Sequence, residues 1–212
     1  MLRSLVITAL LALPISAFGQ QQAPTQPVQA PELKAGDSWT YTLTSNVSRR
    51  VALVAQLSVT AVSPDGFTVE GMRLDTAAPV EVSFWDSQWN RMHGQYVPTK
   101  KNFEFPLDVG KRWAMEYTRA TTDGRGVISF DGEATVSGWE QVTVKAGTFD
   151  TLRIETRTKW QIAGNGATGQ DLETYWYAPK AKRLVKYTFR VLNASSAIVS
   201  DLTQELDEYH AE

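Results

Sequence analysis

The sequence contains no cysteine. This absence excludes disulfide bonds, thiol nucleophiles and cysteine-ligated metals, and it also excludes lipidation at a signal-peptide cysteine. Only two histidines are present, His93 and His210, and neither has a partner at metal-ligand spacing. The 21 Lys and Arg nearly balance the 23 Asp and Glu. No basic stripe is present that would suit nucleic acid or anionic lipid.

Helical periodicity is nearly absent after residue 33, and so are the motifs of common catalytic sites. There is no Gly-x-Ser-x-Gly elbow and no alternation of strands with helices. Distance in sequence alone does not exclude a Ser-His-Asp site. The residue types and motifs present nevertheless favour a protein that is not an enzyme, with no catalytic residue, no metal site and no cofactor.

The chain begins with the pattern of a signal peptide over residues 1–19. Arg3 supplies the positive charge, Leu5 to Ala17 supplies a short apolar run, and Ala17-Phe18-Gly19 supplies the small residues of a cleavage site before Gln20. The apolar run is shorter than the roughly 20 residues that cross a bilayer. An uncleaved membrane anchor is the alternative, but we expect cleavage, a periplasmic or secreted protein and no integral membrane span afterwards.

Residues 20–32 are rich in proline and glutamine and predict a solvated linker, with a Pro-rich ligand as the alternative. The remaining residues, 33–212, are long enough for one domain with a substantial core. Removal of residues 1–19 takes away one charge, Arg3, so 20 basic residues remain against 23 acidic ones and the net charge becomes −3.

Alternation of apolar and polar residues at period two indicates strands with one buried face. The clearest example runs from Thr151 to Ile162, where Leu152, Ile154 and Trp160 share one face and charged residues share the other. Turn sequences such as Pro64-Asp65-Gly66 separate such strands. The pattern predicts an all-β fold, namely a large curved antiparallel sheet that forms a half-barrel or a flattened barrel.

The sequence also repeats itself. Leu33 to Trp39 and Leu107 to Trp113 share the pattern Leu-x-x-Gly-x-x-Trp, and the aromatic segment Glu81 to Asp86 returns as Glu173 to Ala178. These matches predict two duplicated meander units, at about 33–93 and 107–190, in one sheet.

The C-terminal segment at about 198–209 fits either a helix or a strand. Ile198, Leu202, Leu206 and Tyr209 would share a helix face, whereas alternate residues would share a strand face. We favour a strand, because the turn at residues 193–196 would return the chain to the sheet.

Several segments of the second unit resemble a family of exported bacterial β domains of unknown function, some of them labelled TapB-like. They are Phe105 to Trp113, Val142 to Phe149, Tyr175 to Pro179 and Leu184 to Lys186, and the resemblance covers roughly residues 103–209. It implies an envelope location and a long curved sheet similar in outline to the half-barrel carriers that shuttle lipoproteins across the periplasm. It implies no catalytic residues. Lys182-Arg183 stands where the family usually has a glycine.

Aromatic residues are plentiful, with seven tryptophans among 212 residues. Most of them fall on strand faces and are expected to fill the core. Trp85 and Trp89 flank a polar turn near Tyr96, and these three are the candidate ligand-binding residues, at the rim of the sheet. The alternative is that they close one end of a barrel.

The sequence therefore predicts a periplasmic binding or carrier domain for an apolar ligand: a lipid, an acyl chain or a hydrophobic polypeptide segment. Without a covering helix, the sheet should either close on itself or leave an apolar groove open. Two alternatives remain, an assembly module that binds an envelope protein through a sheet edge and a carbohydrate-binding module.

Overall fold

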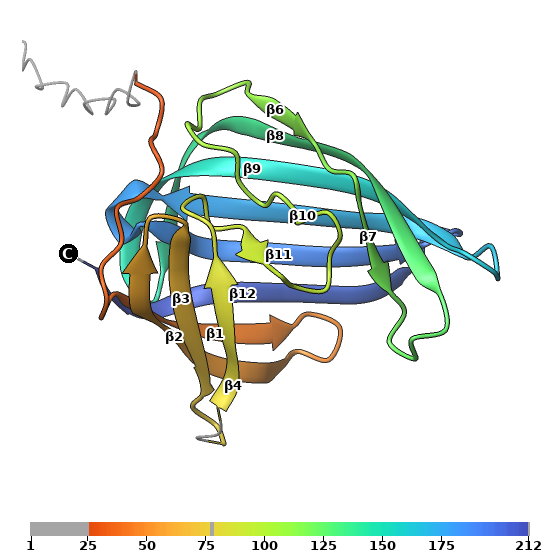
Figure 1. Ribbon diagram of the computed structural model, residues 1–212, viewed down its shortest axis with the longest axis horizontal. Coiled ribbons are helices and arrows are strands. Elements are labelled where there is room, and N and C mark those ends of the chain that lie inside the picture. Colours follow the sequence, from red (N-terminus) through yellow and green to blue (C-terminus); the bar gives the residue numbers. More distant parts are fainter. Residues whose placement is uncertain (1–25, 77–78, 212) are drawn as a thin grey trace, which may run out of the picture.

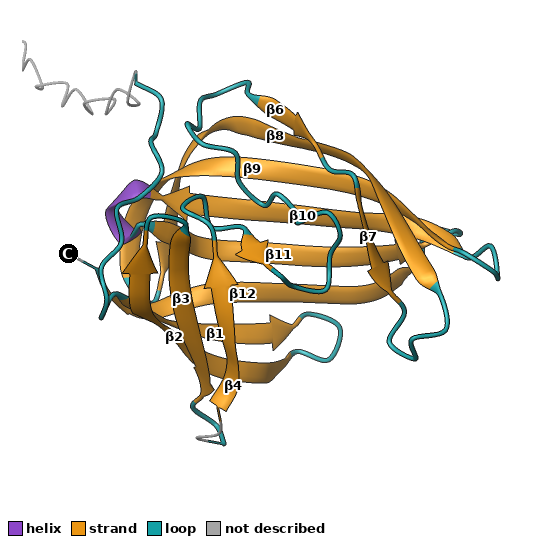
Figure 2. Ribbon diagram, in the orientation of Figure 1, coloured by secondary structure: helices purple, strands orange, loops and turns teal. Residues whose placement is uncertain are grey.

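The computed structural model describes residues 26–76 and 79–211. The predicted signal peptide and residues 20–25 of the predicted linker lie outside this range. The described chain is built almost entirely of strands, and Figure 2 shows one short 3-10 helix beside them. The elements are β1 (Ser38–Ser45), β2 (Arg50–Ser63), β3 (Gly66–Arg73), β4 (Pro79–Trp85), β5 (Arg91–Met92), β6 (Arg112–Ala114), β7 (Tyr117–Ala120), β8 (Val127–Val144), β9 (Gly147–Ile162), β10 (Thr168–Ala178), η1 (Pro179–Ala181), β11 (Arg183–Asn193) and β12 (Ile198–His210).

All strands belong to one 12-stranded antiparallel sheet, in the order β5-β4-β3-β2-β1-β12-β11-β10-β9-β8-β6, with β7 beside β8. The two edges do not pair with each other, so the sheet is open. Figure 1 shows how it rolls up: β8 to β12 form the back, and β2 to β4 fold over the front. The predicted all-β class and curved antiparallel sheet are confirmed, and the closed barrel is not formed.

The two sides of the sheet differ in the way that the alternation predicts. Along β9, Leu152, Ile154, Thr156 and Thr158 are buried, while Glu155 and other charged residues between them face solvent. The first group lies on the core-facing side of the rolled sheet, and the second lies on the outer side. β12 is a strand, so the strand interpretation of residues 198–209 is confirmed over the helix.

A segment of the chain itself covers part of the core-facing side. Residues 93–111, which we call the strap, run between β5 and β6 across the front of β10 and β11 (Figure 1). Phe103 and Leu107 of the strap are buried, and the ring of Phe103 contacts those of Tyr175 and Tyr177 on β10 at 5.7 Å. The sequence predicts closure of the sheet or an open groove. The strap is a third solution, in which an irregular segment supplies the missing layer.

The two Leu-x-x-Gly-x-x-Trp motifs form equivalent turns. The amide of Gly36 donates to Val59 O, and the amide of Gly110 donates to Val136 O, both at 2.8 Å. Both glycines have positive φ, 99° and 86°, a conformation that favours glycine. Trp39 and Trp113 are both buried beside these turns. The duplication stays a prediction, but this geometry agrees with it.

The two ends of the rolled sheet are built differently. The turns at residues 46–49, 121–126, 163–167 and 194–197 all lie at one end, which we call the distal end. At the opposite end β1 begins and β12 ends, and the β8–β9 hairpin reaches across to β12, where the amide of Ala146 donates to Leu206 O at 3.1 Å. In Figure 1 the distal end is on the right.

The described part of the predicted linker is not wholly solvated. Val28 forms a β-bridge with Leu107 of the strap, with hydrogen bonds of 2.7 and 2.8 Å, and packs against the core. The expectation of a fully solvated linker is therefore wrong for this part, because the backbone of Val28 forms hydrogen bonds with the backbone of Leu107.

Candidate functional site

The core-facing side holds a buried ion pair between the strap and β10. Lys100 Nζ lies 2.6 and 2.9 Å from the two carboxylate oxygens of Glu173. Tyr187 donates its hydroxyl proton to the same carboxylate at 2.6 Å, and Thr156 donates at 3.1 Å. The Lys100 side chain is 11% exposed and the Glu173 side chain 3%. These three groups form four hydrogen bonds with the carboxylate, as a buried charge requires.

Both members of this pair are charged. Burial by itself would raise the pKa of Glu173, but the ammonium of Lys100 and the hydrogen bonds from Lys100, Tyr187 and Thr156 outweigh it and lower that pKa. Burial would lower the pKa of Lys100, and the Glu173 charge outweighs it and raises that pKa well above its usual value. Neither group is a proton donor or acceptor near neutral pH, so the pair anchors the strap rather than performing acid–base chemistry.

A second acid, Asp171, lies two residues before Glu173 on the same side of β10. Burial, followed by the negative charge of Glu173, raises the pKa of Asp171 to about 6. Its side chain is half-buried and forms no ion pair within the described residues. Asp171 is therefore the described carboxylate with the strongest tendency to become neutral in weak acid.

Arg183 forms the centre of a separate aromatic cluster. Its guanidinium carbon lies 3.9 Å from the ring centroid of Trp89, and the rings of Trp39, Tyr41 and Trp85 lie at 5.5 to 5.8 Å. Arg183 is 7% exposed, and its Nε and Nη1 atoms have no hydrogen-bond partner within the described residues. Burial lowers its pKa. The rings, rather than a carboxylate, stabilise this cation.

The three predicted ligand-binding residues lie in two places. Trp89 is 1% exposed and donates its indole N–H to Lys182 O at 3.0 Å. Trp85 is half-buried, with its ring 5.6 Å from that of Trp89, in the Arg183 cluster. Tyr96 lies in the strap, half-buried and 5.0 Å from the ring of Tyr117. The structure thus gives all three packing roles, and Trp89 has almost no surface. A ligand-binding role for Trp85, Trp89 and Tyr96 stays a prediction.

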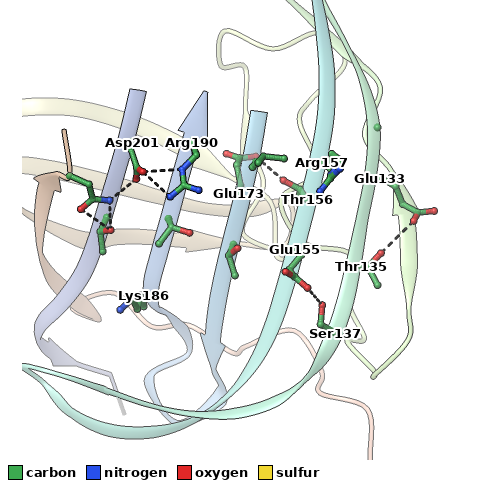
Figure 3. Close-up of a pocket in the computed structure, with 16 residues that line it drawn as sticks. Glu133, Thr135, Ser137, Glu155, Thr156, Arg157, Glu173, Lys186, Arg190 and Asp201 are labelled. Atoms are coloured by element: carbon green, nitrogen blue, oxygen red, sulfur yellow. Dashed lines mark hydrogen bonds and ion pairs between the residues drawn. The ribbon is translucent and has the colours of Figure 1, made fainter. Parts of the chain in front are cut away.

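The outer side of the sheet carries a polar trough of about 950 Å³ across β8 to β12 (Figure 3). Most of its charged groups form ion pairs: Arg190 with Asp201 at 2.8 Å, Lys186 with Glu205 at 2.9 Å, and Glu155 with Arg153 at 2.7 Å. Asn46 and Ser137 also donate hydrogen bonds to Asp201 and Glu155. Arg157 is exposed, with no ion pair within the described residues. A trough of paired charges and threonines is typical of a solvated sheet face.

The core-facing side continues past the strap as an apolar surface that the chain leaves partly uncovered. Tyr41, Leu206 and Tyr187 lie on the core-facing side. Because side chains two residues apart in a strand share a side, their strands direct further apolar residues to this side nearer the distal end. These residues are half-buried and lie on four neighbouring strands: Leu43, Leu53, Phe189, Val191 and Leu202. We call them the open sector.

The histidines do not form a site. His93 stacks on Phe84 at 6.5 Å, and His210 Nε2 lies 3.3 Å from Glu208. Within residues 26–76 and 79–211 no three His, Cys, Asp or Glu residues are arranged to hold a metal ion. No helix among these residues is long and apolar enough to cross a membrane.

Neither buried cation, Lys100 or Arg183, nor Glu173 is among the residues predicted from the sequence. A signal for Glu173 was present, because it shares a strand side with Tyr175 and Tyr177, where an acid needs a buried partner. Arg183 likewise shares a side with Val185 and Tyr187. The strap partner Lys100 had no such signal, because the strap has no periodicity.

No protein-family model and no curated protein matches this sequence. Solved structures share its fold, and we describe two of them. One is a predicted lipoprotein of Parabacteroides distasonis, with a TM-score of 0.55 and 13% identity over 88% of this chain and all of that one. The other is a predicted exported protein of Bacteroides fragilis with a YmcC-like fold, with a TM-score of 0.53 and 12% identity over 87% of this chain and all of that one. The resemblance to exported bacterial β domains is thus confirmed for the fold.

Proposed function

We propose that this protein is a non-enzymatic binding protein of the bacterial envelope and that it holds a single acyl chain on the open sector. The envelope location is part of the proposal. It is supported by the predicted signal peptide and by a fold shared with exported proteins.

The observation that carries the proposal is the half-buried state of the open sector. Leu43, Leu53, Phe189 and Leu202 lie on the side of the sheet that elsewhere forms the core, yet none packs against the buried core cluster. Each methylene of an acyl chain that such a surface takes out of water contributes about 0.8 kcal/mol. A narrow aliphatic ligand matches this surface, because its residues are all apolar and lie on four neighbouring strands.

The proposal is tested by native mass spectrometry of the protein purified from envelopes, followed by titration with a fluorescent fatty acid. We expect a copurified lipid and a saturable fluorescence change. The double variant Leu53→Gln/Leu202→Gln should lose at least tenfold in affinity, because it places two amides on the apolar surface. Val54→Gln is the matched control, since Val54 is also half-buried but alternates to the outer side of β2. A bare protein mass together with equal titrations for both variants would refute the proposal.

A second candidate, an assembly module, is favoured by one observation. The outer edge of β4 pairs with β5 only at Phe84 and Trp85, so the strand leaves backbone groups on that edge to which an envelope partner could add a strand. Glu81, in an ion pair with Arg91, places charge over this edge, as proteins do to prevent unwanted pairing. Crosslinking in cells separates the two functions, because a stoichiometric protein partner without a lipid would favour assembly.

A further inference from the structure

Exposed aliphatic residues gather at the distal end. Eleven large hydrophobic residues are exposed in the described part of the chain, and five of them lie in or beside the distal turns. They are 45 to 68% exposed: Val47, Val51, Val127, Ile198 and Val199. Single exposed valines need no explanation, but a group of them on neighbouring turns marks an interaction surface.

Four of these residues belong to adjacent hairpins. β1 pairs with both β2 and β12, so the turn at 46–49 lies beside the start of β12. The amide and the side chain of Asn46 donate to Asp201, at 2.8 and 2.6 Å, and fasten the two hairpins together. Val47 and Val51 on one hairpin therefore lie at the same end of the sheet as Ile198 and Val199 on the adjacent hairpin, and we call these four residues the aliphatic tip.

Positive charge surrounds the aliphatic tip. Arg49 and Arg50 are exposed and form no ion pair within residues 26–76 and 79–211, and Arg125 in the turn at 121–126 also forms none. Asp123 is the single acid in the four distal turns, and its carboxylate accepts hydrogen bonds from Thr121 and from the amide of Arg125. The sequence shows no basic stripe because these arginines come from separate turns that the fold brings to one end.

We propose that the distal end docks on an anionic phospholipid bilayer, with the aliphatic tip in the headgroup region and the arginines on lipid phosphates. Aliphatic side chains flanked by unpaired cations match the apolar and negative layers of such a surface. A protein interface would instead favour aromatic anchors, and the aliphatic tip has none. This inference builds on the proposed function, because docking would place the open sector next to the membrane that supplies its acyl chain.

The test is co-flotation of the full mature protein with vesicles of phosphatidylethanolamine and phosphatidylglycerol, compared with phosphatidylcholine vesicles. We expect binding to the anionic vesicles, at least tenfold stronger than to the neutral ones and weakened by salt. Arg49→Gln/Arg50→Gln should lose roughly tenfold in partition. The tip variant Val47→Ser/Val51→Ser/Ile198→Ser/Val199→Ser should bind at least tenfold more weakly.

The control removes three valines of similar exposure that lie away from the distal end: Val62, Val82 and Val109, each replaced by serine. It should bind as the unaltered protein does, and circular dichroism should show all variants folded. Equal flotation of the tip and control variants would overturn the proposal. So would a concentration-dependent dimer, seen by light scattering, that the tip variant alone abolishes. Flotation measures membrane docking and does not require a bound acyl chain, whereas the fatty-acid titration measures acyl-chain binding. Either proposal can therefore fail while the other holds.

Discussion

Lys100 and Arg183 are both buried cations on the core-facing side, but different groups stabilise them. Lys100 has a carboxylate partner and joins the strap to β10, 73 residues away in sequence. Arg183 has four aromatic rings and no carboxylate within ion-pair distance among the described residues. Removal of either partner of an ion pair leaves an unpaired buried charge, whereas removal of Arg183 leaves only uncharged rings. We therefore expect substitutions at Glu173 and at Arg183 to lower the free energy of unfolding by different amounts.

The largest effect is expected for Glu173→Gln. This change leaves the Lys100 ammonium buried without its counter-charge and should lower the free energy of unfolding by about 3–5 kcal/mol. Urea denaturation at neutral pH measures it. Lys100→Met/Glu173→Gln should recover more than half of the loss, because it removes both charges. An equally unstable double variant would show that hydrogen bonding, rather than the unpaired charge, causes the effect.

Arg183→Met should cost less, about 1–2 kcal/mol. Methionine fills part of the volume and removes a charge that no carboxylate neutralises, so the main loss is the attraction between the guanidinium and the rings. The same urea titration compares it with Glu173→Gln. A larger loss for Arg183→Met than for Glu173→Gln would contradict the proposed difference between the two cations.

Two neighbouring acids of β10 should respond to pH in opposite directions. The pKa of Asp171 is raised to about 6, so its charge opposes folding at neutral pH, and Asp171→Asn should stabilise the protein by about 1 kcal/mol after solvent screening. This gain should be complete above about pH 6 and vanish toward pH 4. The pKa of Glu173 is lowered, so its contribution is present above its unfolded pKa and is lost as the pH falls through its folded pKa. Urea titrations of the unaltered protein and of Asp171→Asn between pH 4 and pH 7 measure this difference in stability. A stabilisation by Asp171→Asn that grows as the pH falls would refute the prediction.

The smallest effect is expected on the outer side. Arg190→Gln breaks the pair with Asp201, whose geometry resembles that of the Lys100 pair but whose arginine is half exposed. We expect a loss of no more than about 0.5 kcal/mol, reduced further by salt. A loss similar to that of Glu173→Gln would mean that burial does not determine the value of an ion pair in this sheet.

The sequence predicts regular parts of this fold better than irregular ones. Period-two alternation identifies strands such as β9 and the side of each that is buried, because the pleat alone determines this pattern. The strap escapes prediction because its residues, Lys100 and Phe103 among them, follow no period and are placed only by contacts with β10. The open sector cannot be predicted from the sequence for a related reason. Leu43 and Leu202 have the pattern of core residues, and only the extent of the strap shows that they are left partly uncovered.

The pairing of β1 with β12, which are far apart in the sequence, has a consequence for biosynthesis. β1 ends at Ser45, but its partner on one side, β12, begins only at Ile198. The hydrogen-bonding edge of β1 therefore stays unsatisfied until β12 has been synthesised. During that interval the nascent chain presents a strand edge on which other chains can aggregate, so we expect its maturation to depend on chaperones that shield this edge.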